Sequence, residues 1–223
     1  MWCIGKITPE YRERMYDLTD LYNEPYDPER PKIGIDEKSK QLLENIKIPI
    51  PMKKGSPEKY DYEYKRKGTA NIFVAVDPQV GKRVTMVTNQ RTKKDFAYFM
   101  KHLVDEVFRD AKQLRVIVDN LNTHFKSSFD ETFDEEEANR ILSKIEFHYT
   151  PKHASWLNVA EIEINAMDTQ CTGRRMKNKD FLIEEVEAWT NKRNEQKKKI
   201  DWRFTRKDAD RKLSKHYVSQ LNC

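Results

Sequence analysis

The chain has 223 residues, of which 37% are hydrophobic and 35% are charged, and its formal net charge is +5. This length suffices for one domain with a real core, or for one domain with an appendage. The first residues lack the profile of a signal peptide, and no apolar run approaches the roughly 18 residues of a membrane span. The three cysteines, Cys3, Cys171 and Cys223, are too scattered for a disulfide framework or a zinc site. We therefore expect no membrane partner and a reducing compartment, the cytoplasm.

The excess positive charge lies in the last third of the chain. Residues 151–223 contain 16 basic and 11 acidic residues, whereas residues 1–150 contain 26 of each. Such a region suits a polyanionic partner, for example DNA. A solvated helix face explains the same charge equally well, so charge alone leaves both interpretations open.

Hydrophobic periodicity and turn residues predict an alternation of helices and strands. In chain order they predict a helix at 9–22, a strand at 31–36, an irregular insertion at 37–68, a hairpin of strands at 69–77 and 83–89, a helix at 92–109, a strand at 114–119, a helix at 134–144, a strand at 145–150, and helices at 156–171 and 180–198. A hairpin followed by alternating helices and strands indicates a mixed α/β sheet rather than a doubly wound one.

Two carboxylates stand at the ends of predicted strands. Asp36 closes the strand at 31–36, and Asp119 closes the apolar strand at 114–119. Loops diverge at the carboxyl ends of such strands, so side chains can converge there. Magnesium prefers oxygen ligands and needs only a few carboxylates beside substrate phosphate. A third carboxylate would come from the helix at 156–171, whose Glu161 and Glu163 flank its apolar stripe equally, so periodicity does not choose between them.

Three segments resemble the DDE transposases of the mariner-like and bacterial insertion-sequence superfamily. They are IDEK at 35–38, VDNLNTH at 118–124 and HYTPKHASWLNVAEIE at 148–163, and the resemblance extends to the hairpin region and to IDWRFTRKDADRKL at 200–213. It implies a ribonuclease H-like fold: a mixed five-stranded sheet flanked by helices. It also implies Asp36, Asp119 and Glu161 as the catalytic triad, because family members carry the third acid three residues after the asparagine of the Leu-Asn pair, here Asn158.

The activity implied by the resemblance is metal-dependent cleavage of DNA ends followed by strand transfer in transposition. The triad would hold Mg²⁺, for which Mn²⁺ can substitute, and paired metal ions can activate water and then a 3′-hydroxyl. Between Asp119 and Glu161 lie 41 residues, more than is usual in the family, and we expect the extra length to be a loop insertion within 126–139. The competing hypotheses are a ribonuclease H-like nuclease or resolvase, and a non-catalytic DNA-binding remnant of a transposase.

The resemblance also implies a domain organisation. We expect a connector helix region at 1–30, the catalytic domain at 31–175 with a clamp-like insertion at 37–68, and a basic C-terminal helical segment at 176–223 packed on the core. Family members carry an N-terminal helix-turn-helix region that this sequence does not contain, so a separate DNA-binding polypeptide, a fragment and a decayed copy remain alternatives. We expect a homodimer on double-stranded DNA, the transposon ends and the target, at the bacterial nucleoid.

Several further residues are candidates for DNA contacts. Lys152, His153, Arg174 and Arg175 flank the helix that carries the third acid, so they are expected to contact phosphates. His124 and His153 each either contact DNA phosphate or the catalytic water, or are satisfied by local hydrogen bonds. Trp156 is expected to pack in the core rather than to stack on a base. The insertion at 37–68 is either a dimer or DNA clamp, as in mariner relatives, or a plain surface loop.

Overall fold

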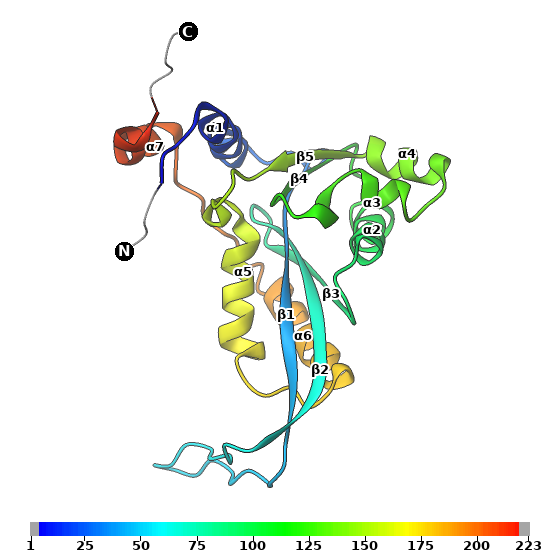
Figure 1. The fold of residues 1–223 in the computed structure, drawn as a ribbon, viewed down its shortest axis with the longest axis vertical. Coiled ribbons are helices and arrows are strands. Elements are labelled where there is room, and N and C mark those ends of the chain that lie inside the picture. Colours follow the sequence, from blue (N-terminus) through cyan, green and yellow to red (C-terminus); the bar gives the residue numbers. More distant parts are fainter. Residues whose placement is uncertain (1–4, 219–223) are drawn as a thin grey trace.

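The structure, a computed structural model, describes residues 5–218, so Cys3, Cys223 and the outermost residues of the predicted terminal segments lie outside the described residues. Five strands form one sheet in the order β3-β2-β1-β4-β5 (Figure 1). They are β1 (Lys32–Asn45), β2 (Tyr64–Asp77), β3 (Lys82–Thr88), β4 (Leu114–Val118) and β5 (Ile145–Tyr149). β1 pairs antiparallel with β2 and parallel with β4, which confirms the predicted mixed α/β sheet.

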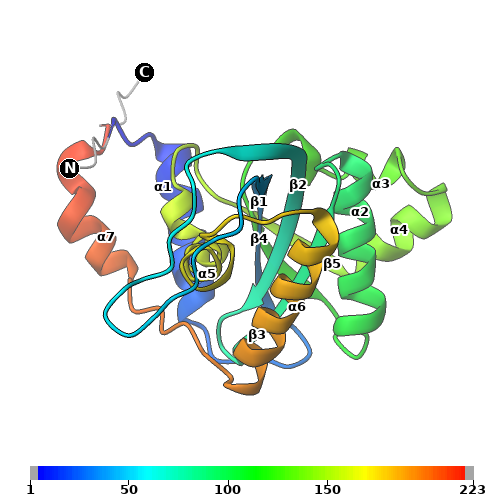
Figure 2. The ribbon, with the colours of Figure 1, turned by 90° about the horizontal axis from the view of Figure 1, so that it is seen from below.

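Helices cover both faces of the sheet (Figures 1 and 2). On one face lie α2 (Lys93–His102), α3 (Ser127–Asp130) and α4 (Glu135–Ser143). On the other lie α1 (Pro9–Asn23), α5 (Val159–Met167) and α6 (Lys179–Glu195), with α7 (Arg206–Leu213) packed beside α1. Wider helical turns at Leu103–Val107 and Asp168–Thr172 prolong α2 and α5.

Alternation along β1 decides which side chains meet which helices. Ile33 and Ile35 are fully buried in the cluster formed with α2 and α4. Gly34 faces the opposite way, against the start of α5. Asp36, two residues further on, therefore lies on the α5 face, whereas Glu37 lies on the α2 face.

Two predicted irregular segments are regular in the structure. β1 continues to Asn45 and β2 begins at Tyr64, so the segment predicted irregular at 37–68 is largely a two-stranded ribbon, and only residues 46–63 project beyond it. Burial explains the extension, because Leu42 and Ala70 of the ribbon pack in a cluster with α6. The stretch at 126–139, predicted as a loop insertion, contains the unpredicted helix α3, anchored by the fully buried Phe129, and then the start of α4, which matches the helix predicted at 134–144.

The C-terminal part of the described chain packs against the sheet. α6 lies along β3 and contributes Leu182, Val186 and Trp189 to the core. The division into a connector, a catalytic domain and a C-terminal segment stays a prediction. Of the helices within residues 5–218, none has the length and apolar character needed to cross a membrane.

Candidate active site

Asp36 lies inside a strand rather than at its end, contrary to the sequence-based prediction. β1 pairs with β4 only over Lys32–Gly34, whereas its pairing with β2 continues to Asn45. Asp36 therefore stands two residues beyond the last position of β1 that pairs with β4, and from there on β1 pairs with β2 alone. Asp119 directly follows Val118, the last residue of β4, as predicted. The two side chains thus share the edge where the parallel pairing stops.

The start of α5 is fixed directly to β1. Asn158 caps the helix, because its Oδ1 accepts a hydrogen bond from the amide of Ala160 at 3.1 Å. Its Nδ2 donates to the carbonyl oxygen of Ile35 at 2.8 Å, and the whole residue is buried. This one side chain joins the residue before Asp36 to the first turn of α5, which carries the exposed Glu161.

Glu163, the alternative third acid, serves the core instead. Its side chain is fully buried and accepts hydrogen bonds from Arg83 of β3 at 2.8 Å and from Arg193 of α6 at 2.9 Å. Both of its oxygens are occupied by guanidinium groups. Glu161 is thus the carboxylate of α5 that remains available at the Asp36 edge.

His124 connects Asp119 to a second acidic side chain, Glu37. Its Nδ1 lies 2.7 Å from Oδ1 of Asp119, and its Nε2 lies 3.1 Å from Oε2 of Glu37. Burial alone would lower the pKa of His124, but the hydrogen bonds to the two carboxylates raise it to about 9. Both ring nitrogens therefore donate at neutral pH, which confirms local hydrogen bonding, one of the two alternatives for this residue.

Glu37 was not singled out in the sequence. Adjacent residues of a strand point to opposite faces, so an acid beside Asp36 is expected to face away from it. Glu37 does so, but its side chain is almost fully buried beside His124, with Arg91 3.7 Å from its second oxygen. The signal that would have found it is the pairing of this acid with the histidine of VDNLNTH.

The electrostatics of the edge indicate that negative charges converge on Asp36. Burial raises the pKa of Asp36 to about 7, and the charges of Glu161 and Asp119, with that of Glu37, add to the rise. Burial also acts to raise the pKa of Asp119, but the hydrogen bonds from His124 and the Leu121 amide outweigh it and leave the pKa lowered. Asp119 is thus held ionised, while Asp36 resists ionisation until a cation offsets the neighbouring charges.

The donor set fits a hard divalent cation. Within residues 5–218, no three acidic, histidine or cysteine side chains already lie close enough to hold a metal ion. Oδ1 of Asp36 accepts from the Glu37 amide and Oδ1 of Asp119 accepts from His124, whereas the second oxygen of each carboxylate has no hydrogen bond within the described residues. A carboxylate whose one oxygen is fixed by a hydrogen bond and whose other oxygen is free is suited to binding Mg²⁺ or Mn²⁺.

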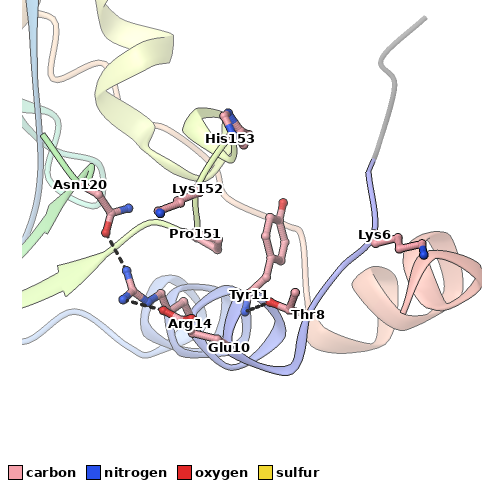
Figure 3. A pocket seen from close by; sticks show the side chains of 9 residues that line it. All are labelled: Lys6, Thr8, Glu10, Tyr11, Arg14, Asn120, Pro151, Lys152 and His153. Atoms are coloured by element: carbon pink, nitrogen blue, oxygen red, sulfur yellow. Dashed lines mark hydrogen bonds and ion pairs between the residues drawn. The ribbon is translucent and has the colours of Figure 1, made fainter. Parts of the chain in front are cut away.

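The four residues predicted to contact DNA fall in two places. Lys152 and His153 follow β5 and lie near Asn120, the neighbour of Asp119 (Figure 3). Arg174 pairs with Glu185, and Arg175 donates to Oδ1 of Asn45 at 2.8 Å, at the base of the projecting segment. Contact of any of these with DNA stays a prediction.

Trp156, the aromatic residue that could have stacked on a base, packs against other side chains of the protein. Trp156 is partly buried and meets Phe204 edge to face, with ring centroids 5.4 Å apart. Core packing is therefore confirmed for Trp156.

Gly34 is needed for the close approach of α5 to β1. A Cβ atom at this position would lie 2.5 Å from Cγ2 of Val159 and 3.0 Å from Oδ1 of Asn158. We expect Gly34→Ala to push the start of α5 from β1 and to lower stability by about 1–3 kcal/mol. Thermal unfolding measures this against Gly5→Ala, whose added methyl group meets nothing. Equal stability of the two variants would contradict the tight packing.

Comparison with known proteins supplies the family and the fold. Residues 33–183 match the DDE superfamily endonuclease family. The crystal structure of the Mos1 mariner paired end complex with Mn is similar with a TM-score of 0.55 and 12% sequence identity, over 89% of this chain and 60% of that chain. The Mos1 strand transfer complex is similar with a TM-score of 0.52 and 12% sequence identity, over 86% of this chain and 58% of that chain. The Mos1 paired end complex with Mg is similar with a TM-score of 0.51 and 11% sequence identity, over 91% of this chain and 66% of that chain.

The chain thus spans less than two thirds of the length of each of these solved relatives. No curated protein matches the sequence. The family match covers more than half of the chain and includes Asp36, Asp119 and Glu161. The chain belongs to the DDE superfamily endonucleases, and its five-stranded mixed sheet is the ribonuclease H-like fold of transposase catalytic domains.

Proposed function

We propose that this chain is the catalytic core of a DNA transposase that cleaves transposon ends and joins them to target DNA, using divalent metal ions. The observation that supports the proposal is that the charges of Asp119, at the end of β4, and Glu161, in the first turn of α5, both act on the buried Asp36 of β1, in a member of the DDE endonuclease family. The likeness to paired end and strand transfer complexes of Mos1 supports transposition over another nuclease reaction.

The three carboxylates would hold the metal, with Mg²⁺ as the expected ion and Mn²⁺ as a substitute. A metal ion bound there would polarise the scissile phosphate and lower the pKa of an attacking water or 3′-hydroxyl. His124 and the Leu121 amide fix one oxygen of Asp119, and the other oxygen has no hydrogen bond within the described residues and would be the one to bind the metal. Asn158 fixes the helix that carries Glu161, and no covalent bond between enzyme and DNA is required.

The proposal extends to partners and place of action. Paired ends require two catalytic cores, so we propose a homodimer on double-stranded DNA. The projecting segment at 46–63 exposes Ile48 to 94% and Tyr62 to 84%, which suits a clamp on a second copy or on DNA. The resemblance to bacterial insertion sequences favours action at the nucleoid of the bacterial cytoplasm.

The test is a cleavage and strand transfer assay on duplex DNA and on pre-cut ends, with Mg²⁺, Mn²⁺ or EDTA. We expect metal-dependent nicking, and joining of pre-cut 3′ ends to a target duplex. Cleavage of branched DNA without joining would instead indicate a resolvase. Absence of both reactions, together with no binding of Mn²⁺ by calorimetry, would indicate a non-catalytic remnant and overturn the proposal.

A further inference from the structure

The buried carboxylate of Glu37 reaches the candidate active site through His124. The side chain of Glu37 is 2% exposed and that of His124 is fully buried, whereas that of Asp119 is 44% exposed. Oε2 of Glu37, the imidazole ring and Oδ1 of Asp119 form a continuous chain, with contacts of 3.1 Å and 2.7 Å. An acid on the α2 face of the sheet is thereby connected to a proposed metal ligand at the catalytic edge.

The packing around His124 fixes the middle of this chain. Phe96 of α2 lies against the imidazole, with ring centroids 4.7 Å apart. The hydroxyl of Tyr149 donates to the carbonyl oxygen of His124 at 3.0 Å, and the His124 amide donates to the carbonyl oxygen of Leu121 at 2.9 Å. Because the backbone is held and both ring nitrogens are bonded, the orientation of the imidazole is fixed, and it fixes Oδ1 of Asp119 in turn.

The charges of the three side chains depend on one another. Each ring nitrogen of His124 faces a carboxylate oxygen, so both nitrogens donate and the ring carries a positive charge. If the ring were paired with Asp119 alone, its charge would neutralise a carboxylate that a divalent cation needs. The negative charge of Glu37 offsets that of the ring, so the three side chains together remain negatively charged at the metal edge.

A structural role alone does not account for Glu37. Its Oε1 is buried without a hydrogen-bond partner within the described residues, and Arg91 lies 3.7 Å from it. A buried carboxylate with one unsatisfied oxygen lowers stability, whereas a glutamine in its place could accept from His124 at a smaller cost. Residues that lower stability in this way are expected at functional sites. The amide of Glu37 also donates to Oδ1 of Asp36 at 2.8 Å, so this residue is connected to two of the three catalytic carboxylates.

We propose that Glu37 is a positioning residue of the metal site, which orients Asp119 through His124 and preserves the negative charge with which Asp119 binds a divalent cation. The inference rests on the proposed function, and it assigns a role to an acid outside the triad, on the opposite face of the sheet from Asp36. Partners that hydrogen-bond to metal ligands typically contribute roughly 10–100-fold to metal affinity. Glu37→Gln retains the shape of the side chain and an acceptor for His124 but lacks the charge, so we expect it to weaken the binding of Mn²⁺ by about tenfold.

The experiment measures the binding of Mn²⁺ to the protein without DNA, so that it does not depend on catalysis. Electron paramagnetic resonance of the free ion gives the dissociation constant for the wild type, Glu37→Gln, His124→Asn and the double variant, at a temperature at which each is folded. The amide of asparagine can replace Nδ1 as the donor to Asp119 but does not extend to Glu37. The matched control is Glu44→Gln, the same change further along β1, where the side chain is 43% exposed.

We expect each single variant to raise the dissociation constant about tenfold, and the double variant to raise it no further, because both substitutions break the same chain. Glu44→Gln should bind Mn²⁺ as the wild type does. If His124→Asn does not fold, because it leaves Glu37 buried without its partner, the double variant is compared with Glu37→Gln, and equal affinities of these two are expected.

Three results would separate this inference from the proposed function. Unchanged affinity in Glu37→Gln, or losses that multiply in the double variant, would overturn the role of Glu37 and leave the proposed function intact. A wild type that binds no Mn²⁺ would overturn both. If the affinities follow the expected pattern but no cleavage or joining is found, the role of Glu37 at the metal site stands and the proposed function fails.

Discussion

The variant Asp36→Asn is expected to lose metal-dependent cleavage and joining and, in the absence of metal, to be more stable than the wild type. Activity is lost because an amide oxygen is a weak ligand and carries no charge to hold the cation. Stability rises because the variant removes a carboxylate whose pKa is raised to about 7 by burial and by the charges of Glu161 and Asp119. Functional sites commonly lower the stability of the fold in this way until their ligand, here a metal ion, is bound.

The gain in stability has a defined pH dependence. The folded wild type retains a proton on Asp36 that the unfolded chain loses near the ordinary pKa of 3.8, so wild-type stability falls as pH rises from about 4 to about 7. Above this window the penalty is constant, and its size is on the order of 4 kcal/mol, because the pKa is raised from 3.8 to about 7 and one pKa unit corresponds to about 1.4 kcal/mol. The difference between the variant and the wild type should therefore grow through this window and then level.

Urea unfolding at pH 5 and pH 8 in EDTA measures this difference, and Asp110→Asn is the control, since the side chain of Asp110 is 95% exposed. Addition of Mg²⁺ should stabilise the wild type and the control but not Asp36→Asn. A variant that is less stable than the wild type at pH 8 would show that the charges do not converge on Asp36. Retained Mg²⁺-dependent cleavage would remove Asp36 from the metal ligands.

The regular elements followed from local signals in the sequence. Asp119 was placed correctly because the apolar run before it is buried on both faces and ends where the polar turn begins. Asp36 was misplaced within its strand because local alternation does not reveal that β1 has two partners of different length, β4 over three residues and β2 over a far longer ribbon. The pairing of distant strands decides where the parallel contact ends, and a short sequence window does not contain it.

The site itself depended on contacts between distant residues. Periodicity left Glu161 and Glu163 equivalent, because both flank the apolar stripe of α5. The choice is made by Arg83, 80 residues away in β3, and by Arg193 of α6, which enclose Glu163. Likewise, the burial of His124 against Phe96, with ring centroids 4.7 Å apart, follows from packing across the α2 face. The sequence identifies such residues as candidates, but the residues that they contact are decided by tertiary packing.

Substitution of Glu163 by glutamine is expected to reduce stability by about 3–5 kcal/mol, the cost of removing one partner from a buried ion pair. The side chains of Glu163 and Arg83 are both fully buried, and Arg193 also donates to Glu163. Glutamine retains the shape of the side chain but leaves the charge of Arg83 buried without compensation. Urea or thermal unfolding measures the loss.

The matched control is Glu161→Gln, the same change two residues earlier on the exposed side of α5. The two variants should separate stability from chemistry. Glu161→Gln keeps the stability of the wild type and loses cleavage, whereas Glu163→Gln loses stability and, at low temperature where it remains folded, retains metal-dependent cleavage. The reverse pattern would make Glu163 the third acid of the site and would require its two arginine contacts to open when DNA binds. A loss of both properties in Glu161→Gln would show that its carboxylate also supports the start of α5, so that its role in catalysis would have to be tested through metal binding alone.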